Sequence, residues 1–162
     1  MRFWAKVGVL FFFVSFISCA GQKPVKVSTG QRIGNANVVF DVEYNSSLDA
    51  LIPGYKVVTV AISNQNFKPF MLDPEQDEWK VVANSGKSWK ASSSLKQSNE
   101  KLWYSLSPEF RHRLSYPLMI PHGSVETVDL FVSDKAKLEN FRGILFKSSF
   151  LGATIEVENI YR

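Results

Sequence analysis

The feature that most constrains the fold of this 162-residue chain is the alternation of apolar and polar residues, which begins near residue 36. The run 37–44, NVVFDVEY, is an example in which one face is entirely apolar: Val38, Phe40 and Val42. Successive side chains of a β-strand point to opposite faces of a sheet, so a period of two predicts strands. The many β-branched and aromatic residues in these runs favour the same conformation.

Similar runs recur between turn residues such as Pro53-Gly54 and Gly152. The run 55–63 is apolar on both faces, which predicts a central strand that is covered on both sides. The other expected strands are 68–73, 78–83, 87–91, 124–132, 142–150 and 153–161. About eight short strands predict an all-β fold, an immunoglobulin-like antiparallel β-sandwich of about 7–9 strands with one short helix.

One hairpin can be predicted with its register. Asn84-Ser85-Gly86 suits a three-residue loop in which Gly86 takes the left-handed conformation. This loop pairs Ala83 with Lys87 and Val81 with Trp89. A two-residue loop would pair Val82 with Trp89 instead, and would reverse the face that Trp89 occupies.

The period of two is lost between the strands at 87–91 and 124–132. The polar, serine-rich run 92–100 predicts a surface loop. Ser107-Pro108-Glu109 then has the pattern of a helix start, with an N-cap serine, proline in the first turn and an acidic residue after it. Because residues before proline disfavour the helical conformation, Tyr116-Pro117 limits this helix to one or two turns, ending near Leu114.

The chain begins with a segment typical of an export signal. Arg2 and Lys6 accompany the apolar run 7–17, which is shorter than the roughly 20 residues of a membrane-spanning helix. The run ends at Phe16-Ile17-Ser18-Cys19, which resembles the lipobox of bacterial lipoproteins, although Phe16 replaces the usual leucine. This resemblance implies cleavage after Ser18 and a lipid on the thiol of Cys19. Ordinary secretion, with cleavage after Ala20, is the alternative.

The lipoprotein interpretation divides the chain into a signal peptide (1–18), a flexible tether (19–35) and a sandwich domain (36–162). The tether is expected because its sequence is polar and shows no sustained periodicity. Since Ala20 rather than aspartate follows the cysteine, the resemblance implies a location at the outer membrane, facing the periplasm. Lysines and arginines of the mature chain are dispersed, so nucleic acid is not an expected partner.

A second resemblance concerns the fold. The segments 54–64 (GYKVVTVAISN), 120–124 (IPHGS) and 141–146 (FRGILF) are similar to strands and turns of the telokin-like, immunoglobulin-like domains of bacterial secreted lipoproteins. The resemblance covers roughly residues 38–157 and rests on apolar alternation and turn glycines. It implies a fold and supplies no shared catalytic residues. The Cys-Trp-Cys pattern of antibody domains is absent.

We expect no catalytic residue, metal ligand or cofactor. His112 stands between two arginines and His122 lies in a Pro-Gly turn, and no hydrolase or metalloprotease motif is present. Met119 and His122 are potential Cu(I) ligands, but a core position for Met119 is favoured. The acidic run 73–78 lacks the order of a calcium loop and is expected to be a solvated loop.

The sequence therefore favours a lipid-anchored module that binds or scaffolds another envelope protein and is not an enzyme. A periplasmic carrier of a metal or glycan is the alternative, and a hydrolase is a more remote one. Loops on rigid sandwiches carry function, so the irregular region 92–121 is the expected binding face. Its aromatic residues and arginines are of the kinds that interface hot spots favour: Trp103, Tyr104, Phe110, Arg111, Arg113 and Tyr116. Trp103 is expected to be the core anchor and Arg111 the principal contact. Trp79 and Trp89 are expected in the core.

Overall fold

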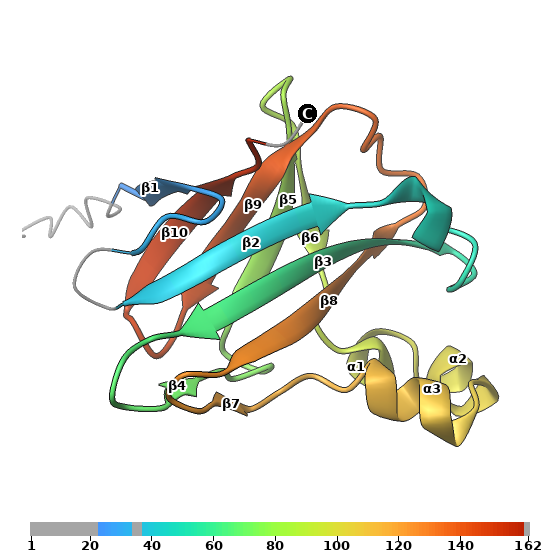
Figure 1. Cartoon of the computed structure of the whole chain (residues 1–162). Helices are drawn as coiled ribbons and strands as arrows, with labels where there is room; N and C mark the ends of the chain where they lie inside the picture. Colours follow the sequence, from blue (N-terminus) through green and yellow to red (C-terminus); the bar gives the residue numbers. More distant parts are fainter. Residues whose placement is uncertain (1–22, 34–36, 161–162) are drawn as a thin grey trace, which may run out of the picture.

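The computed structural model describes residues 23–33 and 37–160. Cys19 and the expected signal peptide lie outside these residues. The described residues form ten strands and a few short helices (Figure 1). The strands are β1 (Val25–Ser28), β2 (Val38–Tyr44), β3 (Tyr55–Asn64), β4 (Phe70–Met71), β5 (Glu78–Ala83), β6 (Ser88–Ala91), β7 (Met119–Ile120), β8 (Val125–Ser133), β9 (Phe141–Ser148) and β10 (Ala153–Glu158).

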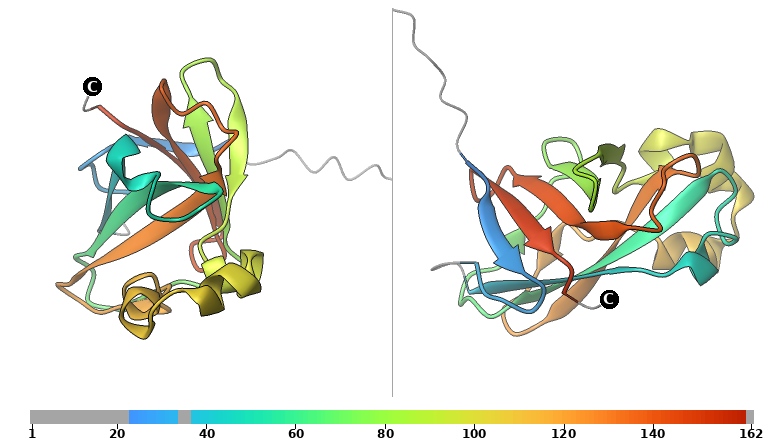
Figure 2. Two further views of the ribbon diagram at one scale, coloured as in Figure 1. Left: turned by 90° about the vertical axis from the view of Figure 1, so that its right-hand side faces the viewer. Right: turned by 90° about the horizontal axis from the view of Figure 1, so that it is seen from above.

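Two sheets face each other as the layers of a sandwich (Figure 2). Within the described residues, one sheet has the order β1-β10-β9-β5-β6 and the other has the order β2-β3-β8, while β4 and β7 form a small separate ribbon. All pairs are antiparallel except β1 with β10. The structure confirms the all-β class and the sandwich architecture.

Aromatic rings from both sheets meet in the main core. Phe40 of β2 lies 5.8 Å from Phe146 of β9, measured between ring centroids, and Trp79 of β5 stacks on the same Phe146. These side chains are fully buried, as the alternation in each strand requires. The core position expected for Trp79 is confirmed, whereas Trp89 is half-buried and packs against the same cluster.

The predicted hairpin register is confirmed. Val81 pairs with Trp89, and the amide of Ala83 donates to the carbonyl of Lys87. Gly86 has a φ of 79°, in the left-handed region that the loop requires. The turn glycine therefore determines which residues of β5 and β6 share a face.

The tether is the first part of the prediction that the structure corrects. Val25–Ser28, within the expected tether, forms β1 and pairs in parallel with β10, Val25 opposite Ile155 and Ser28 opposite Glu158. The salt bridge between Lys26 and Glu156 crosses this pair. The folded domain therefore begins before residue 36, and only a short segment separates Cys19 from the sheet.

The second correction concerns the region between β6 and β7. The expected loop 92–100 contains the helix α1 (Leu95–Ser98), which is followed by α2 (Glu100–Ser105) and by the predicted helix, α3 (Pro108–Arg113). Leu95 is fully buried, which explains why this polar segment is held against the sheet. Ser107 caps α3 as expected, accepting a hydrogen bond from the amide of Phe110. No described helix is long and apolar enough to span a membrane.

The helices cover part of the outer face of the smaller sheet. They contribute to a second apolar cluster, whose buried members are Ile52, Val57, Leu95, Leu114 and Phe131. This second cluster explains why β3 is apolar on both faces, because Val57 contacts it while Val58 and Val60 face the main core. The expectation that the run 55–63 is a central strand is confirmed.

The ribbon is shorter than expected, and part of it was missed. The expected strand 68–73 is reduced to the two residues of β4, and its partner β7 was not predicted. Phe70 and Ile120, which oppose each other, are buried, whereas the next pair, Met71 and Met119, is exposed. The core position expected for Met119 is therefore wrong, since alternation gives the buried side to Ile120.

Candidate binding pocket

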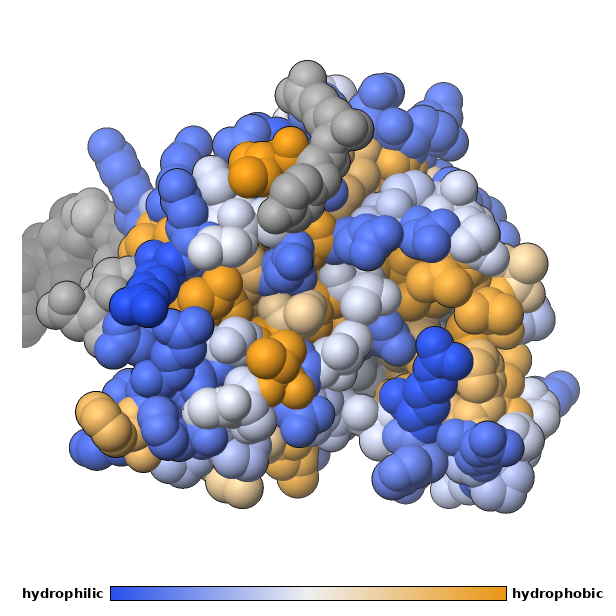
Figure 3. Space-filling model, in the orientation of Figure 1, coloured by the Kyte–Doolittle hydropathy of each residue, from blue (hydrophilic) through white to orange (hydrophobic). Residues whose placement is uncertain are grey.

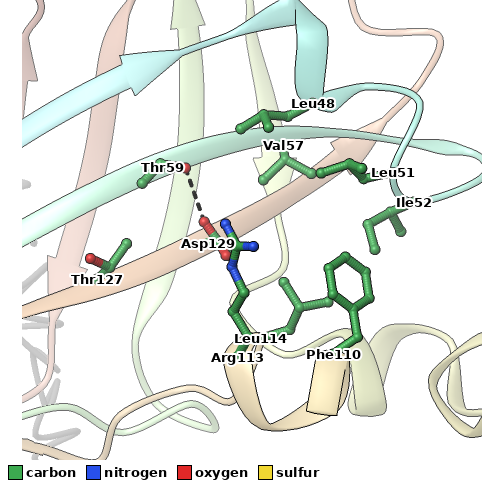
Figure 4. Close-up of a pocket in the computed structure, with 10 residues that line it drawn as sticks. All are labelled: Leu48, Leu51, Ile52, Val57, Thr59, Phe110, Arg113, Leu114, Thr127 and Asp129. Atoms are coloured by element: carbon green, nitrogen blue, oxygen red, sulfur yellow. Dashed lines mark hydrogen bonds between the residues drawn. The ribbon is translucent and has the colours of Figure 1, made fainter. Parts of the chain in front are cut away.

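A pocket of about 300 Å³ lies where the helices meet the smaller sheet (Figure 4). Its walls come from the outer faces of β3 and β8, from α3, and from the connection that contains the short helix η2 (Ser46–Leu48). The lining residues are Leu48, Leu51, Ile52, Val57, Thr59, Phe110, Arg113, Leu114, Thr127 and Asp129. In the space-filling view, apolar side chains gather over the β2–β3 connection and α3 (Figure 3).

Local sequence signals position each wall. In the β3–β8 pair, Thr59 stands opposite Asp129, and both side chains point outward from the main core. Asn45 caps η2, because its side chain accepts a hydrogen bond from the amide of Ser47. Leu114, at the end of α3, is buried in the second apolar cluster and holds that helix over the sheet. The pocket therefore joins elements that are distant in the sequence.

The polar end of the pocket contains a carboxylate and a guanidinium. Thr59 donates a hydrogen bond of 3.0 Å from Oγ1 to Oδ1 of Asp129. Burial raises the pKa of Asp129, while the hydrogen bond from Thr59 and the charge of Arg113 act in the opposite direction. Figure 4 shows the guanidinium of Arg113 beside this carboxylate, with Phe110 and Leu114 on the neighbouring apolar wall.

This arrangement has the composition of a binding site. Ligand pockets are mostly apolar with a few convergent polar groups, and about 300 Å³ is at the small end of their usual range. A titratable group whose pKa is shifted by burial, inside a concavity, is a further indication of a functional site. The pocket can hold one apolar side chain or a small molecule, with a polar group directed at Asp129 and Arg113.

The residues predicted for the binding face are divided among several places. Trp103 and Phe110 are half-buried and pack against the second apolar cluster. Tyr104 is 56% exposed, and the guanidinium of Arg111 lies over its ring at 5.7 Å. Arg113 lines the pocket. The structure thus brings Phe110 and Arg113 to one site and leaves Tyr104 and Arg111 as a pair on the helical surface.

Tyr116 lies away from this surface. It packs against the main core, where its hydroxyl accepts a hydrogen bond from Nε1 of Trp79 and donates one to Asp77, both at 3.4 Å. Asp77 also accepts hydrogen bonds from the amides of Asp73 and Ser149. Tyr116 therefore links the helical segment to the sandwich.

The histidines and the acidic run do not form a site in the described residues. His112 is exposed, and Nδ1 of exposed His122 lies 2.8 Å from the carbonyl oxygen of Asn66. No group of three or more histidine, cysteine, aspartate or glutamate side chains suited to a metal ion occurs in the part of the chain that the structure describes. The acidic run 73–78 was expected to be a solvated loop. This expectation is wrong for Asp77, which is buried and closes the turn between β4 and β5.

Sequence reasoning missed the β2–β3 connection and Asp129. Leu48, Leu51 and Ile52 lie outside any strand pattern, and the only signal that could have indicated a role is their apolar character among polar neighbours. Asp129 lies between two buried residues, Val128 and Leu130, so alternation places it on the outer face without indicating a cover. Its burial depends on α3, which sequence analysis did not position.

Comparisons with known proteins add little to this geometry. No protein-family model matches the chain. No curated protein sequence matches it. The crystal structure of an uncharacterised β-sandwich protein from Clostridium difficile 630 shares 12% sequence identity with it, covering 85% of this chain and 95% of that chain, with a TM-score of 0.41.

Proposed function

We propose that the protein is a lipid-anchored module of the bacterial cell envelope, which binds another envelope protein and is not an enzyme. The pocket between β3, β8 and α3 carries this proposal, because it combines an apolar wall with a half-buried Asp129 and an adjacent Arg113. An apolar side chain of the partner enters the pocket, and its neighbouring polar groups meet the two charges. The resemblance of residues 16–19 to a lipobox supports the lipid anchor and the envelope location.

The surface around the pocket supports a protein partner. Leu51 at the rim is 47% exposed and Tyr104 on the helical surface is 56% exposed, so both offer apolar area to a partner. Aromatic and arginine side chains are enriched at interface hot spots, and the Tyr104–Arg111 pair has this composition. The floor of the pocket belongs to the paired strands β3 and β8, whose hydrogen-bonded backbone limits the entropy that binding must overcome.

Site-specific photo-cross-linking tests this proposal. The full chain is expressed in a bacterium that processes lipoproteins, with a photoreactive amino acid in place of Leu51. This group should form a discrete adduct with one envelope protein. The same group at Lys135, in the exposed loop after β8, serves as a matched control. Asp129→Asn and Arg113→Ala should each reduce the adduct at Leu51. Equal labelling at Leu51 and Lys135 would contradict the proposal.

The small volume of the pocket favours a second candidate, a carrier of a small ligand. A pocket of about 300 Å³ encloses a small molecule more completely than it encloses a protein segment. Native mass spectrometry of freshly purified full chain distinguishes the two candidates. A carrier would show a bound mass that Arg113→Ala removes, whereas a protein-binding module would show the mass of the chain alone.

A further inference from the structure

Most of the exposed large apolar side chains in the described residues lie at one end of the sandwich, away from the pocket. Phe67, in the loop before β4, is 90% exposed, and Leu118, next to β7, is 60% exposed. The remaining members are nearly half exposed or more: Val25, Met71, Met119, Val125 and Phe150. We call these residues the apolar end. Only Leu51, Tyr104 and Ile160 are comparable exposed apolar residues elsewhere in the described chain.

Contacts between separate elements show that this is one end of the molecule. Phe150, in the β9–β10 turn, packs edge-on against Phe70 of β4, with ring centroids 5.5 Å apart. Met71, Leu118 and Phe150 line one shallow hollow. Phe67 stacks on His122 at the tip of the same ribbon. In Figure 1 the ribbon and the β9–β10 turn lie together at the lower left.

The first strand begins at the same end. β1 runs parallel to β10, and Val25 is opposite Ile155, just after the turn that carries Phe150. Six peptide units separate Cys19 from Val25, and a fully extended chain of that length spans at most about 20 Å. A lipid on Cys19 therefore holds this end of the sandwich, and not the opposite end, close to the bilayer surface.

We infer that the apolar end is a membrane-contact surface, which lies on the bilayer when the anchor is in place. This inference rests on the lipid anchor of the proposed function. Exposed apolar groups gain from entry into the boundary between headgroups and acyl chains, and a short tether keeps their effective concentration there high. Lys23 and Lys68 are exposed near this end and can approach anionic headgroups. The same orientation places the polar β5–β6 turn on the far side, facing the periplasm.

A spin label on the lipidated protein, processed to begin at Cys19, in vesicles of phosphatidylethanolamine and phosphatidylglycerol tests the orientation. Because lipid occupies Cys19, a single introduced cysteine is the only free thiol. Lys68→Cys reports on the apolar end and Ser85→Cys, in the β5–β6 turn, is the matched control at the other end. The label at position 68 should be several-fold more accessible to oxygen, relative to a water-soluble nickel reagent, than the label at position 85.

Two double variants distinguish membrane contact by the apolar end from attachment through the lipid anchor. The double variant Phe67→Ser and Leu118→Ser should make the label at position 68 no more accessible to oxygen, relative to the nickel reagent, than the label at position 85. The double variant Leu51→Ser and Tyr104→Ser removes exposed apolar area elsewhere and should leave the accessibility at position 68 unchanged. Intact mass and vesicle flotation report independently on the anchor. If the protein carries the lipid and floats with the vesicles, but the label at position 68 is as accessible to water as the label at position 85, the membrane contact is overturned and the anchor is not. A protein without the lipid mass would overturn the anchor, and the membrane contact with it.

Discussion

Trp79 of β5 lies flat against Phe146 of β9, with ring centroids 3.8 Å apart and ring planes inclined by 13°. Both side chains are fully buried at the centre of the sandwich. Through Nε1, Trp79 also donates a hydrogen bond to Tyr116, so the same residue connects the core to the segment that follows the helices. Trp79 therefore takes part both in the packed inner face of the larger sheet and in the attachment of the segment that follows the helices.

Trp79→Ala should lower the free energy of unfolding by about 3–5 kcal/mol, because it removes a large buried side chain and leaves a cavity. Trp89→Ala is the matched control, since Trp89 is half-buried at the sheet edge and should cost clearly less. Urea denaturation followed by circular dichroism measures both values. Equal losses in the two variants would show that Trp79 is not the central packing residue.

Gly143→Ala should also destabilise the protein, by about 2–4 kcal/mol. A Cβ at this position would lie 2.0 Å from the carbonyl oxygen of Val157 on β10, and a backbone atom cannot move away without distorting the sheet. Gly86→Asn is the control, because asparagine tolerates the left-handed conformation and open space surrounds Gly86. Thermal unfolding should show a large loss for the first variant and a small one for the second.

The fold was predictable where each strand carries its own signal. Alternation identified β2, β3, β5 and β8, and Gly86 determined the register of β5 with β6, because these effects act between near neighbours in the sequence. β1 alternates only over the four residues VKVS, a run too short to indicate a strand. Its four residues become a strand through pairing with β10, a partner more than a hundred residues away, so local sequence did not distinguish them from a tether.

The N-cap residues of α1 and α2 are signals that could have identified these helices, but they lie in a polar, serine-rich run that is equally typical of a surface loop. Ser94 and Asn99 accept hydrogen bonds from amides in the first turns of α1 and α2, the signature of N-caps. Each helix is too short to show a period of 3.6, and in α1 one buried residue, Leu95, provides the attachment. The pocket was beyond prediction for a related reason, since Asp129 acquires its cover only when α3 packs over β8.

Asp129→Asn should remove a pH dependence of stability. Because burial raises the pKa of Asp129 in the folded state, its contribution is fully present below the unfolded value of about 3.9 and is lost as pH rises through the folded value. At pH 7 the free energy of unfolding of the variant should equal that of the wild type or be higher by less than about 1 kcal/mol. The difference is small because the carboxyl group of Asp129 is partly solvated. Denaturation at pH 4 and pH 7, with exposed Asp41→Asn as control, measures the difference.

Tyr116→Phe should cost about 1 kcal/mol at pH 7, because it removes the hydroxyl between Trp79 and Asp77. Burial raises the pKa of Tyr116 well above its ordinary value near 10, with the nearby charge of Asp77 acting in the same direction. The folded state therefore keeps this proton when the unfolded chain has released it, so stability falls as pH rises above about 10. The variant lacks this group and should lose stability less steeply in that range. Unfolding curves at pH 8, 9.5 and 11 measure the slope, with Tyr104→Phe as the exposed control, and parallel slopes for wild type and Tyr116→Phe would disprove the assignment.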